Sequence, residues 1–300
     1  MRIREADIEF LSGGEICRAW LFAPDQADEP RPCIVMGHGL GLTRRNGLRA
    51  FAEAFARAGY FALVFDYRRF GDSGGAPRQV ISFRGQLEDW AAALAFVRAL
   101  PEVDDACVVT WGFSLGGGHA MTTAARDGAV AAVIAVTPVF SGLSSTLAAM
   151  KWWSLRNMLR IVARGLRDLL SAFLGRQPVT VPLAAPPGEV GLLTSPDAYA
   201  GYRQIVSEDF DFNTAARIAL YFWSYAPGRL LRQFPGSVLV LPSIIDEICP
   251  PRPTIGRAQR SRNAEIVELS CDHMAFAVEP HRSVVVDATL DFLRRHVPVC

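Results

Sequence analysis

The sequence has almost no net charge, no long apolar run and, in its first residues, no apolar stretch typical of a secretory signal. Its 300 residues carry a formal charge of +1, whereas nucleic-acid-binding domains usually show a basic excess, so we expect no nucleic-acid partner. The most apolar stretch, about 129–140, is too short to cross a bilayer, which argues against an integral membrane segment. The first ten residues alternate polar and apolar side chains, unlike the apolar core of a signal peptide. We therefore predict a cytoplasmic protein.

Cysteines are present but show no metal-binding or disulfide pattern. The six cysteines are dispersed without a C-x-x-C pair, which argues against both a zinc site and a disulfide framework. Half of the residues are hydrophobic and a fifth are charged, a balance that excludes a disordered chain. At this length we expect one large domain that contains an insertion.

Short apolar runs alternate with amphipathic stretches over the first 140 residues. The apolar runs predict strands at 32–37, 60–66, 107–111 and 130–136. The amphipathic stretches predict helices at 48–58, 83–100 and 114–126. Because the apolar runs are continuous rather than alternating, their strands are expected to be buried on both faces. This order predicts an α/β fold with a mostly parallel sheet covered by helices on both sides.

The alternation stops between residues 141 and 235, where no clear strand is present. The segment 155–174 has the apolar spacing of an amphipathic helix. A strand at 237–241 restores the earlier order. We therefore predict a core made of residues 1–140 and 236–300, with 141–235 inserted into it as a helical cap.

The segment Gly112-Phe113-Ser114-Leu115-Gly116 matches the G-x-S-x-G pattern of a nucleophile elbow. A serine in a tight turn between a strand and a helix projects its oxygen above the sheet, and the positions two before and two after lie too close to neighbouring chain for a side chain. The N-terminus of the helix favours developing negative charge. A strand is predicted before this segment and a helix after it, so we interpret Ser114 as a nucleophile. The alternative is a glycine-rich turn that only happens to hold a serine.

A nucleophilic serine needs a base, and the base needs an acid that orients it. His273 follows a strand predicted at 265–269, and Asp246 follows the strand at 237–241. Loops after parallel strands meet at one edge of the sheet, where ligands bind, so we predict His273 as the base and Asp246 as the acid. The alternatives are a surface-loop histidine and a turn-forming aspartate, and Glu247 is the first rival for the acid.

Acyl transfer also needs hydrogen-bond donors for an oxyanion. We predict one donor in the backbone N–H of Leu115 and a second in that of Leu40, within the loop Gly37-His38-Gly39-Leu40-Gly41. Glycines in this loop let the backbone approach a substrate closely. The loop lacks the Lys-Ser/Thr pair of a phosphate-binding loop and matches a dinucleotide motif only incompletely. No nucleotide cofactor is therefore expected.

The inserted segment is rich in aromatic side chains. We predict that Trp152, Trp153, Tyr199 and Trp223 bind the substrate, because apolar pockets suit an acyl chain or a polycyclic ester. The alternative is that these rings form the core of the cap itself. The helix predicted at 155–174 has arginines along its other side, which fits an ordinary solvated face or a helix on a membrane surface.

A charged turn follows the strand predicted at 60–66. It reads Asp66-Tyr-Arg-Arg-Phe-Gly-Asp-Ser-Gly-Gly. We predict that the carboxylate of Asp66 and the guanidinium of Arg68 order this loop by hydrogen bonding. Neither side chain is expected to be catalytic.

Together these motifs resemble the α/β-hydrolase superfamily along almost the whole chain. The order Ser114, Asp246, His273 is the triad order of that superfamily, and the loop 37–41 and the turn 66–73 also match. More narrowly, the chain is similar to bacterial serine hydrolases related to dienelactone hydrolases and acetyl-esterase-like proteins. The resemblance implies an eight-stranded, mostly parallel sheet with a cap inserted after the sixth strand.

Two departures from the narrower group stand out. Dienelactone hydrolases proper use a cysteine nucleophile, whereas this chain has Ser114. Many relatives have a glycine three residues before the acid, whereas this chain reads Ser243-Ile-Ile-Asp246. The loop that carries the predicted acid is therefore more apolar than in those relatives.

These observations predict hydrolysis of a carboxylic ester through an acyl-enzyme, with a small-molecule ester or acyl substrate and no metal or organic cofactor. Three alternatives stay open: a thioesterase or acyltransferase, a cyclase or lyase that uses the same triad, and a binding module without activity. A homodimer is also possible.

Overall fold

The computed structural model describes residues 1–26 and 29–299, so residues 27, 28 and 300 of the predicted core lie outside the description. Its main sheet has eight strands in the order β1-β2-β4-β3-β5-β6-β9-β10. Their bounds are β1 (Ile3–Ser12), β2 (Glu15–Pro24), β3 (Arg31–Gly37), β4 (Phe61–Phe65), β5 (Val103–Phe113), β6 (Ala132–Val136), β9 (Ser237–Leu241) and β10 (Ala264–Ile266). From β4 to β10 neighbouring strands are parallel, which confirms the predicted fold class.

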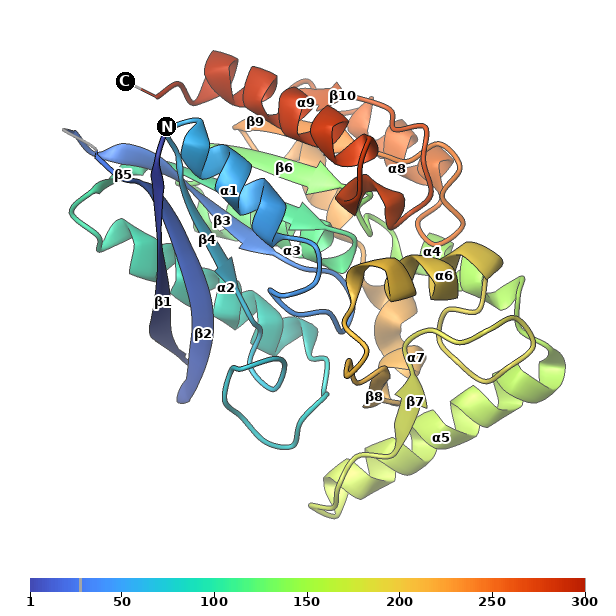
Figure 1. The fold of residues 1–300 in the computed structure, drawn as a ribbon. Helices are drawn as coiled ribbons and strands as arrows, with labels where there is room; N and C mark the ends of the chain where they lie inside the picture. Colours follow the sequence, from blue (N-terminus) through green and yellow to red (C-terminus); the bar gives the residue numbers. More distant parts are fainter. Residues whose placement is uncertain (27–28, 300) are drawn as a thin grey trace.

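The first two strands form an antiparallel hairpin at one edge of the sheet (Figure 1). A two-residue loop joins them, and both Gly13 (φ +55°) and Gly14 (φ +83°) have positive φ. Such backbone angles suit the tight turns that match the twist of a hairpin. The alternation of polar and apolar residues at the N-terminus is typical of an edge strand such as β1, whereas no strand was predicted at the position of β2.

Helices cover both faces of the sheet, as predicted (Figure 1). They are α1 (Arg49–Arg57), α2 (Phe83–Arg98), α3 (Leu115–Asp127), α8 (Pro251–Ala258) and α9 (His281–His296). Helices α1 and α9 pack together on one face, and α2 and α3 pack together on the other. The central strands β4 and β6 are buried along their whole length, which explains their continuous apolar sequences.

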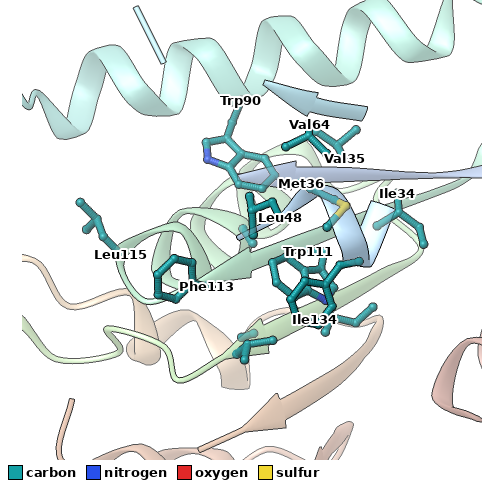
Figure 2. Packing of buried hydrophobic residues seen from close by; sticks show 14 of the residues in the cluster. Ile34, Val35, Met36, Leu48, Val64, Trp90, Trp111, Phe113, Leu115 and Ile134 are labelled. Carbon is teal, nitrogen blue, oxygen red and sulfur yellow. The ribbon is translucent and has the colours of Figure 1, made fainter. Parts of the chain in front are cut away.

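Large aromatic side chains fill the two layers between sheet and helices (Figure 2). On one face, Trp111 of β5 packs against Phe51 of α1, with ring centroids 5.3 Å apart. On the other face, Trp90 of α2 meets Phe65 of β4 edge to face at 5.4 Å. All four rings are buried. Burial of such areas is the main stabilising contribution in a domain of this size.

The segment between β6 and β9 lies beyond the carboxyl ends of the parallel strands (Figure 1). It contains α4 (Gly142–Met150), α5 (Leu155–Phe173), β7 (Thr180–Pro182), α6 (Pro196–Ile205), β8 (Asn213–Ala215), α7 (Ile218–Tyr221), η1 (Phe222–Ser224) and η2 (Pro227–Arg232). The helix predicted at 155–174 is α5. No strand was expected here, but β7 and β8 form a small antiparallel pair. No helix within residues 1–26 and 29–299 is long and apolar enough to span a bilayer.

Asp66 orders the turn as predicted, since its carboxylate accepts a hydrogen bond from the backbone N–H of Asp72 at 3.1 Å, but the arginine that it binds is Arg44 and not Arg68. The Asp66 carboxylate accepts hydrogen bonds from the backbone N–H of Arg44 (2.6 Å) and from its guanidinium (3.1 Å). Arg68 instead pairs with Asp89 of α2 at 2.6 Å. Arg44 lies in the loop after β3, and Asp89 lies in α2. Each is about twenty residues away in sequence from the residue that it binds, because this loop and α2 meet at the end of β4.

Candidate active site

The predicted nucleophile, Ser114, lies in the sharp turn between β5 and α3. Its backbone has φ +54° and ψ −121°. A positive φ is uncommon for a residue with a side chain and is tolerated where the surrounding structure enforces it. The conformation places the Ser114 hydroxyl at the carboxyl edge of the sheet, beside the N-terminus of α3.

The two glycines of the G-x-S-x-G segment are required by close backbone packing. A Cβ atom on Gly112 would lie 2.1 Å from the carbonyl oxygen of Gly116. A Cβ atom on Gly116 would lie 2.5 Å from the carbonyl oxygens of Gly37 and His38. A side chain at Gly112 would collide with the first turn of α3, and one at Gly116 would collide with the end of β3 and the loop after it. The motif is therefore explained by the contacts of this turn.

Ser114, His273 and Asp246 form one chain of hydrogen bonds. Nδ1 of His273 lies 2.6 Å from Oδ2 of Asp246, and Nε2 lies 3.0 Å from Oγ of Ser114. A carboxylate only accepts hydrogen bonds, so Nδ1 carries the proton and Nε2 is free to accept one from the serine hydroxyl. All three side chains are buried. The arrangement can pass the serine proton to the imidazole.

The loop after β9 fixes the carboxylate of Asp246. Its Oδ1 atom accepts hydrogen bonds from the backbone N–H groups of Ile248 (2.8 Å) and Cys249 (2.7 Å), which leaves Oδ2 for His273. The side chain of Glu247, the rival acid, is exposed. The geometry therefore supports Asp246 over Glu247 as the group that orients the imidazole.

The loop 37–41 lies directly against the predicted nucleophile. A Cβ atom on Gly39 would be 3.1 Å from Cβ of Ser114. Leu40 lines the same cavity as the serine, and Leu115 begins α3 next to it. Within the described residues, no acceptor is found for the backbone N–H of Leu40 or of Leu115. Both N–H groups are therefore available to a ligand.

A mostly apolar cavity opens onto Ser114 and His273. It is lined by Leu40, Ser114, Val139, Ser145, Thr146, Ala149, Trp153, Leu192, Leu193, Tyr202, Ile218, Ala219, Phe222, Ile248, His273 and Met274. Most of these residues belong to the segment between β6 and β9. Its apolar lining suits the apolar part of a small-molecule ligand.

Of the four predicted substrate-binding aromatics, only Trp153 lines this cavity. Trp223 is 53% exposed, and its indole N–H donates to the carbonyl of Leu220. Tyr199 packs on the ring of Phe212. Trp152 is half-buried outside the lining. The structure thus does not place Trp152, Tyr199 or Trp223 at the site.

Sequence reasoning missed several lining residues on α4. Ser145, Thr146 and Ala149 line the cavity, and Ala149 lies one helical turn after the other two, so all three share one side of the helix. Small residues on one face of the first inserted helix were the only signal that could have identified them. Tyr202 and Phe222 also line the cavity. Other aromatic residues lie close to both in the sequence, and nothing in the sequence indicates which of these rings face the cavity.

Two further histidines near the site are buried and neutral. Burial lowers the pKa of His38 and of His119 to about 3. Nε2 of His119 lies 2.9 Å from Oε1 of Gln86, and Nδ1 lies 2.6 Å from the hydroxyl of Tyr225. Both ring nitrogens of His119 are thus satisfied within the protein, which gives this residue a packing role.

Cys249 is the third side chain, with Asp246 and His273, in a group whose ligand-type atoms all lie within 4.8 Å of one another. Burial raises the pKa of its thiol well above the usual value, and its sulfur accepts a hydrogen bond from Ser145 at 3.7 Å. The hydrogen bonds of Asp246 and His273 to each other and to Ser114 account for these side chains without a metal ion.

Comparison with known proteins gives a consistent assignment. Residues 32–280 match the family model described as alpha/beta hydrolase fold. The chain is 41% identical to the quorum-quenching protein AidA of Acinetobacter baumannii (strain MDR-ZJ06) over 295 residues, which cover 98% of this chain and 95% of that protein. It is 32% identical to a thiohydrolase of Eupenicillium brefeldianum over 177 residues, 58% of this chain and 53% of that protein.

A solved structure shares the same fold. The alpha/beta hydrolase GrgF from Penicillium sp. sh18 superposes with a TM-score of 0.81 at 22% identity, covering 98% of this chain and 99% of that chain. The family match spans most of the sequence, and the sheet order and helix layers agree with it. The chain therefore belongs to the α/β-hydrolase family.

Proposed function

We propose that this protein is a serine hydrolase that cleaves a carboxylic ester through an acyl-enzyme. The observation that carries the proposal is the hydrogen-bonded chain Ser114–His273–Asp246 at the end of an apolar cavity. A hydroxyl that can lose its proton to an oriented imidazole is the chemistry of a Ser-His-Asp triad.

In the first half of the reaction, the Ser114 oxygen attacks the ester carbonyl while Nε2 of His273 takes its proton. The carbonyl oxygen becomes an oxyanion, which accepts hydrogen bonds from the backbone N–H groups of Leu40 and Leu115. Asp246 holds the imidazole in place and stabilises its positive charge. When the carbon–oxygen bond to the alcohol breaks, His273 returns the proton to the leaving oxygen. The acyl group then remains on Ser114 as an ester.

In the second half, water takes the position of the alcohol. His273 removes a proton from this water as the water oxygen attacks the acyl carbon, and the same two N–H groups stabilise the oxyanion. The bond between the acyl carbon and the Ser114 oxygen breaks, and His273 returns the proton to the serine. The products are the free acid and the regenerated enzyme, with no cofactor required.

The cavity supports a substrate with an apolar acyl part. Its lining is mostly aliphatic and aromatic, and few polar side chains besides Ser114 and His273 face it. The relative AidA is named for quorum quenching, which makes small acylated signal molecules reasonable candidates. An acylated lactone belongs to this class, because its ring is an internal ester whose alcohol stays attached after cleavage.

A thioester substrate is the second candidate, since a relative at 32% identity is a thiohydrolase. The same triad attacks a thioester carbonyl, and the leaving thiol departs more readily than an alcohol. An acyl acceptor other than water would turn the same intermediate into a transferase product. The proposed residues are identical in all these reactions, so only the products separate them.

The experiment is turnover of p-nitrophenyl esters from acetate to palmitate and of acylated lactones, with Ser114→Ala as the control. We expect activity in the wild type, a loss of about 10³-fold or more in the variant, and an acyl adduct on Ser114 by mass spectrometry. Equal activity in the two proteins would overturn the proposal. The oxygen ester and the thioester of one acyl group are then compared as substrates. Each is tested in heavy-oxygen water with and without an added alcohol: heavy oxygen in the released acid indicates hydrolysis, and an ester of the added alcohol indicates transfer.

A further inference from the structure

Helix α5 lies at the outer edge of the inserted segment, away from the main sheet (Figure 1). Only one of its faces packs on the protein. Asn157, Ile161, Gly165 and Asp168 are buried on that face. The Asn157 amide donates to the carbonyl oxygen of Gly188 at 2.8 Å, so the helix is firmly attached along this side. The rest of its circumference faces outward.

A second face of α5 is apolar and exposed. It consists of Leu155, Leu159, Val162, Leu166, Leu169, Leu170 and Phe173. Steps of three and four residues place these side chains in one stripe along the helix. Phe173 is 88% exposed. Soluble monomers rarely leave so large a continuous apolar surface in water, and such patches usually mark an interaction site.

The third face of α5 carries four arginines. At about 100° per residue, Arg156, Arg160, Arg164 and Arg167 lie between the apolar stripe and the packed face. Among the described residues, none of them has an ion pair, whereas many other arginines of the chain do. The one acidic residue of the helix, Asp168, is buried and bound to Arg217 at 2.6 Å. The exposed surface of α5 is therefore purely cationic and apolar.

We propose that α5 docks on the surface of a bilayer that contains anionic phospholipid. The apolar stripe would enter the boundary between headgroups and acyl chains, and the arginines would lie at the level of the phosphates. Each cation near such a surface adds to the attraction. The helix lies on the membrane and does not cross it, in keeping with the lack of a spanning helix in the described residues.

A second copy of the chain fits this surface less well. A symmetric dimer brings the same patch of both partners together. In an antiparallel pair of α5 helices, the arginine faces would lie side by side, with no exposed acidic side chain on either helix to compensate them. Anionic headgroups supply the missing negative charge, and acyl chains cover the stripe.

The test is co-sedimentation of the full chain with two kinds of vesicle, pure phosphatidylcholine and phosphatidylcholine mixed with phosphatidylglycerol. We expect binding to the anionic vesicles, at least about tenfold weaker binding to the neutral ones, and loss of binding when salt is raised from about 0.1 M to about 1 M. Leu159→Asp/Leu166→Asp and Arg160→Glu/Arg167→Glu should each lower the affinity by about tenfold or more.

Matched controls are placed on other helices. Val284→Asp on α9 changes an exposed apolar residue and Arg252→Glu on α8 an exposed arginine, and both variants should bind like the wild type. Circular dichroism checks that each variant is folded, and the arginine pair tests the proposal if the leucine pair does not fold. Equal binding of both vesicle types, no binding to either, or a dimer in sedimentation velocity that Leu166→Asp dissociates would each overturn it.

Discussion

The hydroxyl of Tyr202 donates a hydrogen bond to the carbonyl oxygen of Leu40 across 2.9 Å. Tyr202 belongs to α6 in the inserted segment, whereas Leu40 belongs to the loop after β3 that we propose as part of the oxyanion site. The tyrosine is buried and lines the cavity. This bond ties the orientation of the Leu40 backbone to the position of α6.

We expect Tyr202→Phe to lower kcat by about fivefold to tenfold, with little change in KM, because a hydrogen bond worth about 1 kcal/mol no longer holds the Leu40 backbone. Steady-state kinetics on the best p-nitrophenyl ester measures this. Tyr199→Phe, on the same helix but outside the cavity, is the control and should behave like the wild type. A change in KM alone would assign Tyr202 to substrate packing instead.

Asp246→Asn should lower kcat by about 10⁴-fold, because an amide that donates to His273 favours the wrong tautomer of the imidazole. Glu247→Gln changes an exposed neighbour in the same loop and should leave kcat within about twofold. The two variants, compared at one pH, decide between the rival acids. Similar losses in both would contradict the assignment of Asp246.

Cys249→Ser should retain most of the activity. The thiol is buried, burial raises its pKa well above the usual value, and the proposed reaction does not use it. Serine keeps a similar volume and can accept the hydrogen bond that Ser145 donates to the sulfur. kcat/KM of the purified variant is the measurement, and a near-total loss in folded protein would show that the thiol takes part.

Stability should fall as the pH drops below about 6.5, in part because of His119. Burial lowers its pKa from 6.5 to about 3 in the folded state, so the unfolded chain binds a proton that the folded chain does not. The stability that this residue contributes is complete above pH 6.5 and is lost progressively toward pH 3. At pH 5 the loss amounts to about 2 kcal/mol.

His119→Gln should remove this part of the pH dependence, because glutamine still offers a donor and an acceptor to Gln86 and Tyr225. Urea unfolding at pH 7 and pH 5 gives the difference for each protein. Burial also lowers the pKa of His38 to about 3 and raises the pKa of Asp66 to about 6. Both residues are present in the wild type and in the variant, so their contributions cancel when the two proteins are compared. Equal pH dependence in the two proteins would refute the assignment.

The sequence was sufficient where a signal is local. Continuous apolar runs identified β3, β4, β5 and β6, because strands buried on both faces need apolar residues at every position. The elbow at Ser114 was recognisable because two close backbone approaches leave room only for glycine. Topology then placed His273 and Asp246 at the same sheet edge, since loops after parallel strands meet there.

What could not be predicted depends on packing between distant segments. Arg44, rather than Arg68, reaches Asp66, and no spacing rule connects residues on two separate loops. Trp153 and Trp223 are the same residue type in the same segment, yet one lines the cavity and the other is exposed. An aromatic residue is equally compatible with a ligand site, a local core or a surface, so composition alone did not separate them.

Both edges of the main sheet are unsuited to pairing with another chain. The outer strand β1 carries Arg4, Glu5, Asp7 and Glu9 among its exposed positions, and charged side chains on an edge strand oppose strand addition. The opposite edge, β10, is only three residues long, and its Glu265 is bound to Arg295. Both edges of the main sheet are therefore poor templates for the addition of a strand from another chain.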